Sequence, residues 1–259
     1  MVNKNNYSSN LTKELPGFSA EERDVWKSLF ETHYEQAKPL ASEVVLAGIK
    51  SLNINAKNIP RLEDINKVLK GQTGWNVMGS EEMEIGDNFF SLLSNKIFPI
   101  TASIRNPEDD DHYVSTDLFD DLFGTVPLLN HLPFAIFLHE LSKLALEFKE
   151  MPWAIELLTR VYRFTVKYGL IHEKGNVKVY GSAITTSLGE MRYSLTSDAA
   201  HYPFDVAQII KTPFRKDVFQ SQYWVIKSFD ELIESIPDIR SELKQILKQP
   251  QNNSLKKAC

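Results

Sequence analysis

Helical spacing of the apolar residues is the feature that most constrains the fold of this chain. From Phe134 to Phe148 apolar residues recur every three or four positions, and Ala154 to Tyr168 repeats the pattern before Gly169. Such spacing gathers the apolar side chains on one face of a helix. Patterns typical of strands are few and short, the clearest being near Val177 to Tyr180. The sequence therefore predicts a mainly α fold (α+β) with a few short strands.

Two earlier helices are predicted from their start signals. Ser19 and Glu22 form a capping box, which satisfies backbone donors at a helix start. Pro60 opens the second, with apolar residues at helical spacing behind it and Gly71 near its end.

Two further helices are predicted around prolines and glycines. A buried helix is expected from Phe89 to Phe98, continuing after a kink at Pro99. Another is expected to begin at Ser115 and to stop by Gly124 and Pro127.

Composition and charge exclude several classes of protein. Hydrophobic residues make up 42% of the 259 residues and charged residues 24%, a globular balance. The net charge of −5 gives no sign of the basic stripe of a nucleic-acid binder. No window approaches about 18 consecutive apolar residues, so no membrane span is expected. The single cysteine, Cys259, excludes an internal disulfide and a cysteine metal site. A cytoplasmic location is predicted.

Polar ends and an uninterrupted middle predict a single domain. We expect a flexible N-terminus over residues 1–15, one domain over 16–240 and a polar C-terminal tail over 241–259. No linker, internal repeat or low-complexity tract divides the middle segment.

An acidic cluster is the conspicuous motif. Glu108 to Asp111 is followed by Asp117, Asp120 and Asp121. Oxygen-rich clusters can hold Mg²⁺ or Ca²⁺, but this spacing fits no calcium loop. A solvated acidic loop is the simpler interpretation.

Six segments of the chain form a recognisable set: Asn58–Asp64, Thr73–Trp75, Ser103–Arg105, Asp117–Leu128, Tyr162–Leu170 and Tyr180–Glu190. Together they resemble the catalytic domain of the pterin-dependent aromatic amino acid hydroxylases, most of all the short bacterial phenylalanine hydroxylases. They keep the family's order and nearly its spacing over about residues 20 to 235. The resemblance implies one mainly helical domain with a deep pocket. It also predicts a monomer, because the regulatory and tetramerising segments of the animal enzymes have no counterpart.

The resemblance also implies that the iron-ligand positions of the family are changed in this chain. The family holds iron through two histidines and a glutamate, and the matching positions are Asp120, Thr125 and Lys167. A two-histidine-one-carboxylate site needs imidazole, and a charged lysine has no lone pair. The loop Ser80–Glu84, expected to line the pterin, is acidic where the family has small and apolar residues. We therefore expect no metal site, and neither iron nor tetrahydropterin as a cofactor.

The substrate side of the pocket is better preserved. Arg105 matches the family's arginine that clamps the substrate carboxylate, a task that suits a planar guanidinium. A structural salt bridge is the alternative role for Arg105. The other predicted substrate-binding residues are Tyr113, Asp117, Arg163, Tyr168 and Ser187.

Three functions stay open at this point. The first, favoured because Arg105 and an ionisable pocket are kept, is a metal-independent enzyme of specialised biosynthesis. It would act on an aromatic or amino-acid-derived small molecule, with Lys167 and Asp120 or Asp121 as general acid and base. The second is a non-catalytic binding or regulatory homologue in which Asp120 offsets the charge of Lys167. The third is a residual pterin-dependent hydroxylase with a displaced metal near Asp117, Asp120 and Asp121. In each case the expected partner is a small aromatic or amino-acid-like ligand, with no nucleic acid and no membrane.

Overall fold

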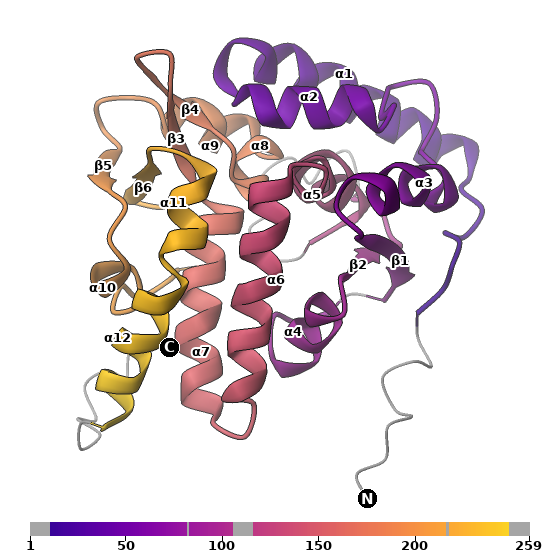
Figure 1. Ribbon diagram of the computed structural model, residues 1–259. Helices are drawn as coiled ribbons and strands as arrows, with labels where there is room; N and C mark the ends of the chain where they lie inside the picture. Colours follow the sequence, from indigo (N-terminus) through magenta and orange to yellow (C-terminus); the bar gives the residue numbers. More distant parts are fainter. Residues whose placement is uncertain (1–10, 82, 106–115, 216–217, 249–259) are drawn as a thin grey trace, which may run out of the picture.

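Two neighbouring helices form the centre of the molecule in the computed structural model, which describes residues 11–81, 83–105, 116–215 and 218–248. They are α6 (Leu132–Glu147) and α7 (Pro152–Tyr162), and α12 (Ile236–Lys248) packs beside both (Figure 1). Each central helix buries a wide apolar face, as its spacing predicts.

The first helix begins where the capping box predicts. The Ser19 hydroxyl accepts the Glu22 N–H, and the Glu22 carboxylate accepts the Ser19 N–H at 2.7 Å. This start fixes α1 (Ala20–Leu40), which α2 (Glu43–Ser51) and α3 (Leu62–Gln72) follow. The predictions for both early helices are confirmed.

A small parallel sheet replaces part of a predicted helix. Strand β1 (Asn76–Ser80) pairs with β2 (Ile97–Thr101), and α4 (Asp87–Ser94) connects them. The predicted helix from Phe89 to Phe98 is therefore wrong beyond Ser94. Lys96 has φ +56°, which ends the helical path before β2 begins. Pro99 lies in this strand, which has a single partner and so can tolerate a missing N–H.

A second sheet of four short strands has the order β4-β3-β6-β5. The strand pattern near Val177 to Tyr180 is confirmed as β4 (Asn176–Val179), which pairs with β3 (Leu170–Glu173) in an antiparallel hairpin. The sequence did not indicate β5 (Ala200–Pro203) or β6 (Gln222–Ile226), and β6 pairs with β3 in parallel. Such pairing depends on contacts between distant segments.

The helical path through Gly124 does not stop where the sequence predicts. It continues from the π-helix η1 (Asp120–Thr125) directly into α5 (Val126–Leu129). Pro127 lies in the first turn of α5, directly after the widened π-turn. The predicted end by Gly124 and Pro127 is therefore wrong.

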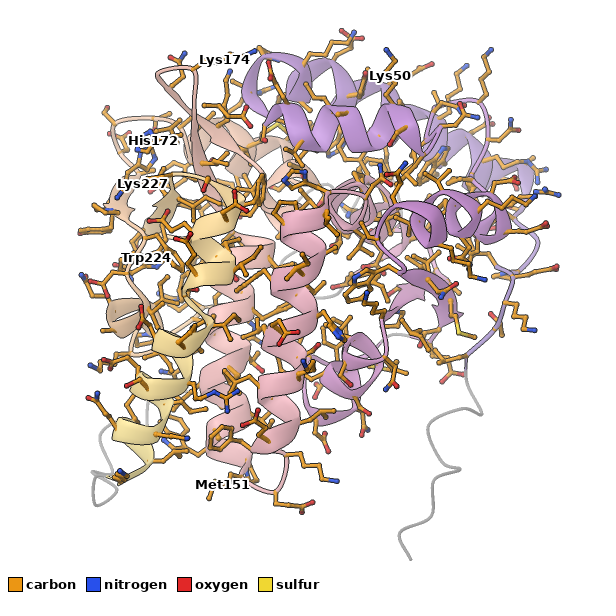
Figure 2. All side chains as sticks on the ribbon, viewed as in Figure 1. Lys50, Met151, His172, Lys174, Trp224 and Lys227 are labelled. Carbon is orange, nitrogen blue, oxygen red and sulfur yellow. The ribbon has the colours of Figure 1, made fainter. Side chains whose placement is uncertain are left out.

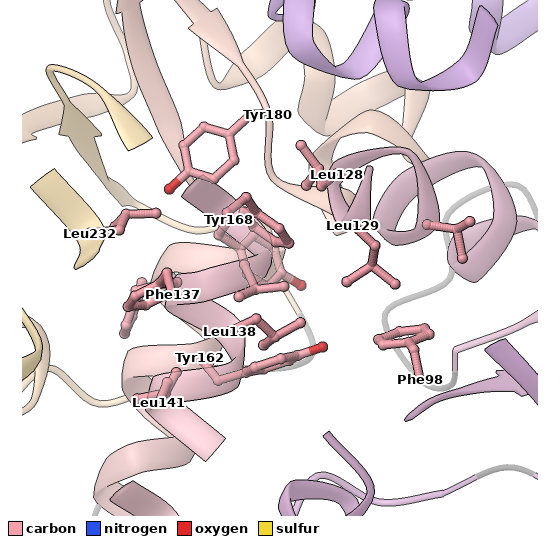
Figure 3. Close-up of a cluster of buried hydrophobic side chains, with 14 of the residues drawn as sticks. Phe98, Leu128, Leu129, Phe137, Leu138, Leu141, Tyr162, Tyr168, Tyr180 and Leu232 are labelled. Atoms are coloured by element: carbon pink, nitrogen blue, oxygen red, sulfur yellow. The ribbon is translucent and has the colours of Figure 1, made fainter. Parts of the chain in front are cut away.

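One core joins these elements. Figure 3 shows side chains from α6, α7 and the sheet side of the molecule meeting around Leu138 and Tyr168. The remaining short helices cover its edges: α8 (Ser182–Thr185), α9 (Leu188–Tyr193), α10 (Val206–Ile209) and α11 (Phe229–Glu234). The prediction of a mainly helical single domain with a few short strands is confirmed.

Charged side chains lie on the outside of this core. Lys50, Lys174 and Lys227 project outward from separate elements, and Met151 lies at the α6–α7 connection, half exposed (Figure 2). Helix α12 runs from Ile236 to Lys248, so it continues past residue 240, where the C-terminal tail was predicted to begin. The limits given for the domain and its two ends stay predictions.

Among the described helices, none is by itself long and apolar enough to cross a membrane. The segment Asp120–Leu129 meets that test only together with α6, and a bend of 103° separates the two.

Candidate functional site

Two π-helices carry the predicted catalytic residues. η1 carries Asp120 and Asp121, and η2 (Arg163–Lys167) follows α7 and ends with Lys167. Helix α8 packs against both. A π-turn widens the helix by one residue, is rare, and is frequent at functional sites. The backbone alone, with two widened turns that contact the same helix, therefore makes this region the candidate functional site.

The backbone behind Lys167 is held by close packing. A Cβ atom at Gly181 would lie 2.5 Å from the carbonyl oxygen of Lys167 and equally close to the Gly169 nitrogen. Only glycine allows this approach, which presses the start of α8 against the end of η2.

Arg105 is the centre of a buried ion-pair cluster. Its Nε and Nη2 donate to the two Asp117 carboxylate oxygens, each at 2.9 Å. Nη2 also donates to the Asp120 carboxylate, and Nη1 reaches the Thr186 carbonyl oxygen at 3.4 Å. The guanidinium lies over the Phe119 ring, 5.7 Å from its centre. The structure thus brings three predicted residues together: Arg105, Asp117 and Asp120.

The cluster shifts the pKa values of its two carboxylates in opposite directions. Burial works to raise the pKa of Asp117, but hydrogen bonds and charge from Arg105 outweigh it and lower that pKa. Burial and repulsion from Asp117 instead raise the pKa of Asp120. Burial opposes the charge of Arg105, yet Asp120 and Asp117 raise the pKa of its guanidinium. Arg105 therefore stays charged throughout.

Asp121 and Lys167 lie together on the other side of η1. Burial raises the pKa of Asp121 to about 7, against the opposing influence of the Lys167 charge and the Thr101 N–H, which Asp121 accepts at 2.8 Å. Lys167 is buried and forms no ion pair or hydrogen bond with any residue that the structure describes. The predicted pairing of Lys167 with Asp120 is therefore corrected. Asp120 pairs with Arg105, and Lys167 influences Asp120 and Asp121 only through its charge.

A narrow pocket of about 30 Å³ opens between Asp121, Tyr162 and Lys167. This volume admits a water-sized group. The Tyr162 hydroxyl is buried without a hydrogen-bond partner among the described residues, and it points from α7 toward the side of Phe98 (Figure 3). The Thr125 hydroxyl is likewise buried and unpartnered within the described ranges. The apolar wall of the pocket consists of Met83, Ile85, Phe89, Phe98 and Pro99.

The remaining predicted substrate residues lie apart from this cluster. Arg163 lies over the Phe214 ring at 4.6 Å, and the Tyr168 ring packs on Phe214 at 5.3 Å. Burial lowers the pKa of Arg163. Tyr113 and the acidic run from Glu108 lie outside the described residues. Phe214 carried no signal in the sequence, since its role depends on a loop brought in from far along the chain.

Ser187 caps a helix in this structure, and its predicted substrate-binding role stays a prediction. Its hydroxyl accepts the Glu190 N–H and caps α9. The neighbouring Thr186 is the residue whose carbonyl reaches Arg105, and its side chain lies beside Asp120. The Ser-x-x-Glu pattern of residues 187–190 was a cap signal that could have indicated this.

Comparison with known proteins identifies the family. The family model described as biopterin-dependent aromatic amino acid hydroxylase matches residues 5–255. This chain belongs to that family. The resemblance inferred from the six segments is therefore confirmed.

Relatives of this hydroxylase-family chain include bacterial phenylalanine-4-hydroxylases. The protein from Vibrio cholerae is 35% identical over 83% of this chain and 74% of its own length. That from Chromobacterium violaceum is 33% identical over 87% of this chain and 76% of its own. A crystal structure of the C. violaceum enzyme bound to cobalt matches with a TM-score of 0.88 and 31% identity, covering 93% of this chain and 88% of that one.

These comparisons contradict two predictions about this family member. One is a function outside hydroxylation, as a metal-independent enzyme or a non-catalytic homologue. The other is the loss of iron and tetrahydropterin as cofactors. The family is biopterin-dependent, the relatives are named as hydroxylases, and one C. violaceum structure contains iron(III) and 7,8-dihydrobiopterin. The findings support a hydroxylase. An enzyme is confirmed at family level, whereas a monomer, a cytoplasmic location and the absence of nucleic-acid or membrane partners stay predictions.

The side chains at the positions matched to the family's iron ligands do not fit a two-histidine-one-carboxylate site. Arg105 holds the Asp120 carboxylate, Thr125 supplies a neutral hydroxyl, and Lys167 supplies a cation. Over the described ranges, no three His, Cys, Asp or Glu side chains are grouped so that they could hold a metal ion. We therefore derive no chemical step through iron.

The unpartnered Tyr162 hydroxyl leads to a test of stability. We expect Tyr162→Phe to leave the free energy of unfolding unchanged or to raise it by about 1 kcal/mol, because no protein hydrogen bond is lost. Tyr223→Phe is the matched control, since its buried hydroxyl donates to the Glu190 carboxylate at 2.7 Å. We expect that control to lose about 1.5–3 kcal/mol in urea denaturation. Equal losses in both variants would show that the Tyr162 hydroxyl is hydrogen-bonded in solution.

Proposed function

We propose that this chain is a hydroxylase that acts on the ring of an aromatic amino acid or of a closely related aromatic compound. The observation that carries the proposal is the family match along residues 5–255, together with relatives named for phenylalanine hydroxylation. The close likeness to a solved phenylalanine hydroxylase supports it.

The narrow pocket has a polar end and an apolar wall that includes Phe89 and Phe98. Its volume of about 30 Å³ admits a water-sized group, so a substrate ring enters only if side chains of the lining move apart. Asp121, with its raised pKa, can hold or release a proton near neutral pH beside the Tyr162 hydroxyl. Catalytic roles for Lys167, Asp120 and Asp121 stay predictions. So do the substrate-binding roles of Arg105, Tyr113, Asp117, Arg163, Tyr168 and Ser187.

Hydroxylation can be tested directly. Purified protein supplied with ferrous iron, tetrahydropterin and oxygen is incubated with phenylalanine, tyrosine, tryptophan and phenethylamine. We expect a product heavier by one oxygen atom from at least one of them, detected by mass spectrometry, and bound iron is measured on the same sample. Boiled protein and omission of the pterin are the negative controls.

A triple variant makes a negative result informative. Asp120→His, Thr125→His and Lys167→Glu together introduce the family's iron-binding residue types at the matched positions. Product from the triple variant but none from the wild type would overturn the proposed function, because the assay would then be shown to work on this fold. Product from the wild type would support the proposal and would mean that the chain holds its metal through residues other than the family's two histidines and glutamate.

A further inference from the structure

The guanidinium of Arg105 is already occupied by the protein's own acceptors. A guanidinium has five N–H donors. Two of them form the fork with Asp117, a third reaches Asp120 and a fourth points to the Thr186 carbonyl. Only 5% of the Arg105 side chain is exposed. A ligand carboxylate therefore cannot form a two-pronged contact with Arg105 unless one of these partners leaves.

The two carboxylates on Arg105 differ in how firmly they are held. Asp117 also accepts the backbone N–H groups of Arg105 and Asp120, both at 2.8 Å, so it is part of the local backbone structure. The Asp120 carboxylate accepts no backbone N–H in the described contacts and is the more exposed of the two, at 13% against 8%. Asp120 is thus the less firmly held of the two carboxylates on Arg105.

An occupied Arg105 leaves a ligand carboxylate without a cationic partner in this cluster. Burying a carboxylate without such a partner is costly. An aromatic amine brings no carboxylate and so avoids this cost.

We infer that Asp120 is a specificity-determining residue. Its carboxylate occupies the guanidinium of Arg105 in place of a ligand carboxylate, so the site favours an aromatic amine over the corresponding amino acid. The inference rests on the proposed function only in taking the ligand to be aromatic. Asp120 acts here through Arg105, and no chemical step is assigned to it.

Binding by calorimetry, without iron, pterin or turnover, tests the selectivity. Phenylalanine and phenethylamine share the same ring and differ in the carboxylate. We expect the wild type to bind phenethylamine on the order of tenfold more tightly, and Asp120→Ala to tighten phenylalanine binding on the order of tenfold. Asp121→Asn is the matched control, because it removes a nearby carboxylate that does not touch Arg105. It should leave the preference for the amine in place.

Two results would overturn the inference. One is tight phenylalanine binding by the wild type with no change in Asp120→Ala. The other is the same change of preference in Asp121→Asn, which would assign the effect to charge alone. Circular dichroism verifies that each variant is folded.

Formate gives a second test that needs no aromatic ligand. In Asp120→Ala a formate ion can take the vacated place on Arg105, so formate should raise the melting temperature of this variant more than chloride at equal ionic strength. The wild type should show no such difference. Equal effects of formate on the two melting temperatures would show that formate does not bind Arg105 at the position vacated by the Asp120 carboxylate. Because neither readout depends on turnover, a failure of the hydroxylation assay would leave both results interpretable.

Discussion

Arg105→Ala is expected to lower the free energy of unfolding by about 3–5 kcal/mol, because it leaves two buried carboxylates without their cation. Asp117 and Asp120 both depend on this guanidinium, and the three side chains are almost entirely shielded from water. Urea denaturation at neutral pH measures the loss as a shift of the midpoint at unchanged slope. Arg240→Ala is the control, since Arg240 pairs with Glu147 at the surface, where about 0–1 kcal/mol is typical.

The loss should depend on pH. Arg105 lowers the pKa of Asp117 in the folded protein, so this contribution to stability is fully present above the ordinary aspartate pKa. It is lost as the pH falls through the lowered pKa. The difference between wild type and Arg105→Ala should therefore be largest at neutral pH and shrink below about pH 4. A difference no larger than that of Arg240→Ala, at every pH, would show that the carboxylates find other partners.

The parts of the fold that local signals specify were predictable. The capping box before α1 and the apolar spacing of α6 and α7 act within a few residues, so they can be recognised in sequence. The prediction of one helix from Phe89 to Phe98 was wrong beyond Ser94. The apolar run is compatible both with one long buried helix and with a short buried helix followed by a buried strand. Pairing of β2 with β1 decided between them, and that pairing is not visible in local spacing.

The site was predictable only as a set of positions. The resemblance pointed to Arg105, Asp117 and Asp120, and the structure joins these three. Which carboxylate meets which cation depends on the directions of side chains on a widened helix, and a π-turn shifts those directions by one residue. The expected pairing of Lys167 with Asp120 was incorrect for that reason. Ser187 was predicted to bind substrate and that stays a prediction; in the structure its hydroxyl caps α9, and Thr186 lies beside Asp120.

The placement of Lys167 depends on tight backbone contacts next to it. The chain leaves η2 at Tyr168, whose N–H donates to the Arg163 carbonyl oxygen at 2.8 Å, and turns into β3 through Gly169. The N–H groups of Tyr180 and Gly181 both donate to the Gly169 carbonyl oxygen, at 3.2 and 2.9 Å. The position of Lys167 is thus set by hydrogen bonds and packing at the following residue.

Gly169→Ala is therefore expected to destabilise the protein by about 3 kcal/mol, as overpacking does in a close-packed core. A Cβ atom at this position would lie 2.1 Å from the Tyr180 ring and 2.4 Å from the Thr165 carbonyl oxygen. The ring can move, but the Thr165 oxygen belongs to the backbone of η2, so the π-helix itself must shift. Gly71→Ala is the matched control, because Gly71 lies in α3 with open space where its Cβ would point. Alanine there should raise the free energy of unfolding by about 0.5–1 kcal/mol. Urea denaturation of both variants gives the comparison. If Gly169→Ala were as stable as the wild type, the close contact between η2 and the segment at Tyr180 would not exist in solution, and the placement of Lys167 would have to be revised.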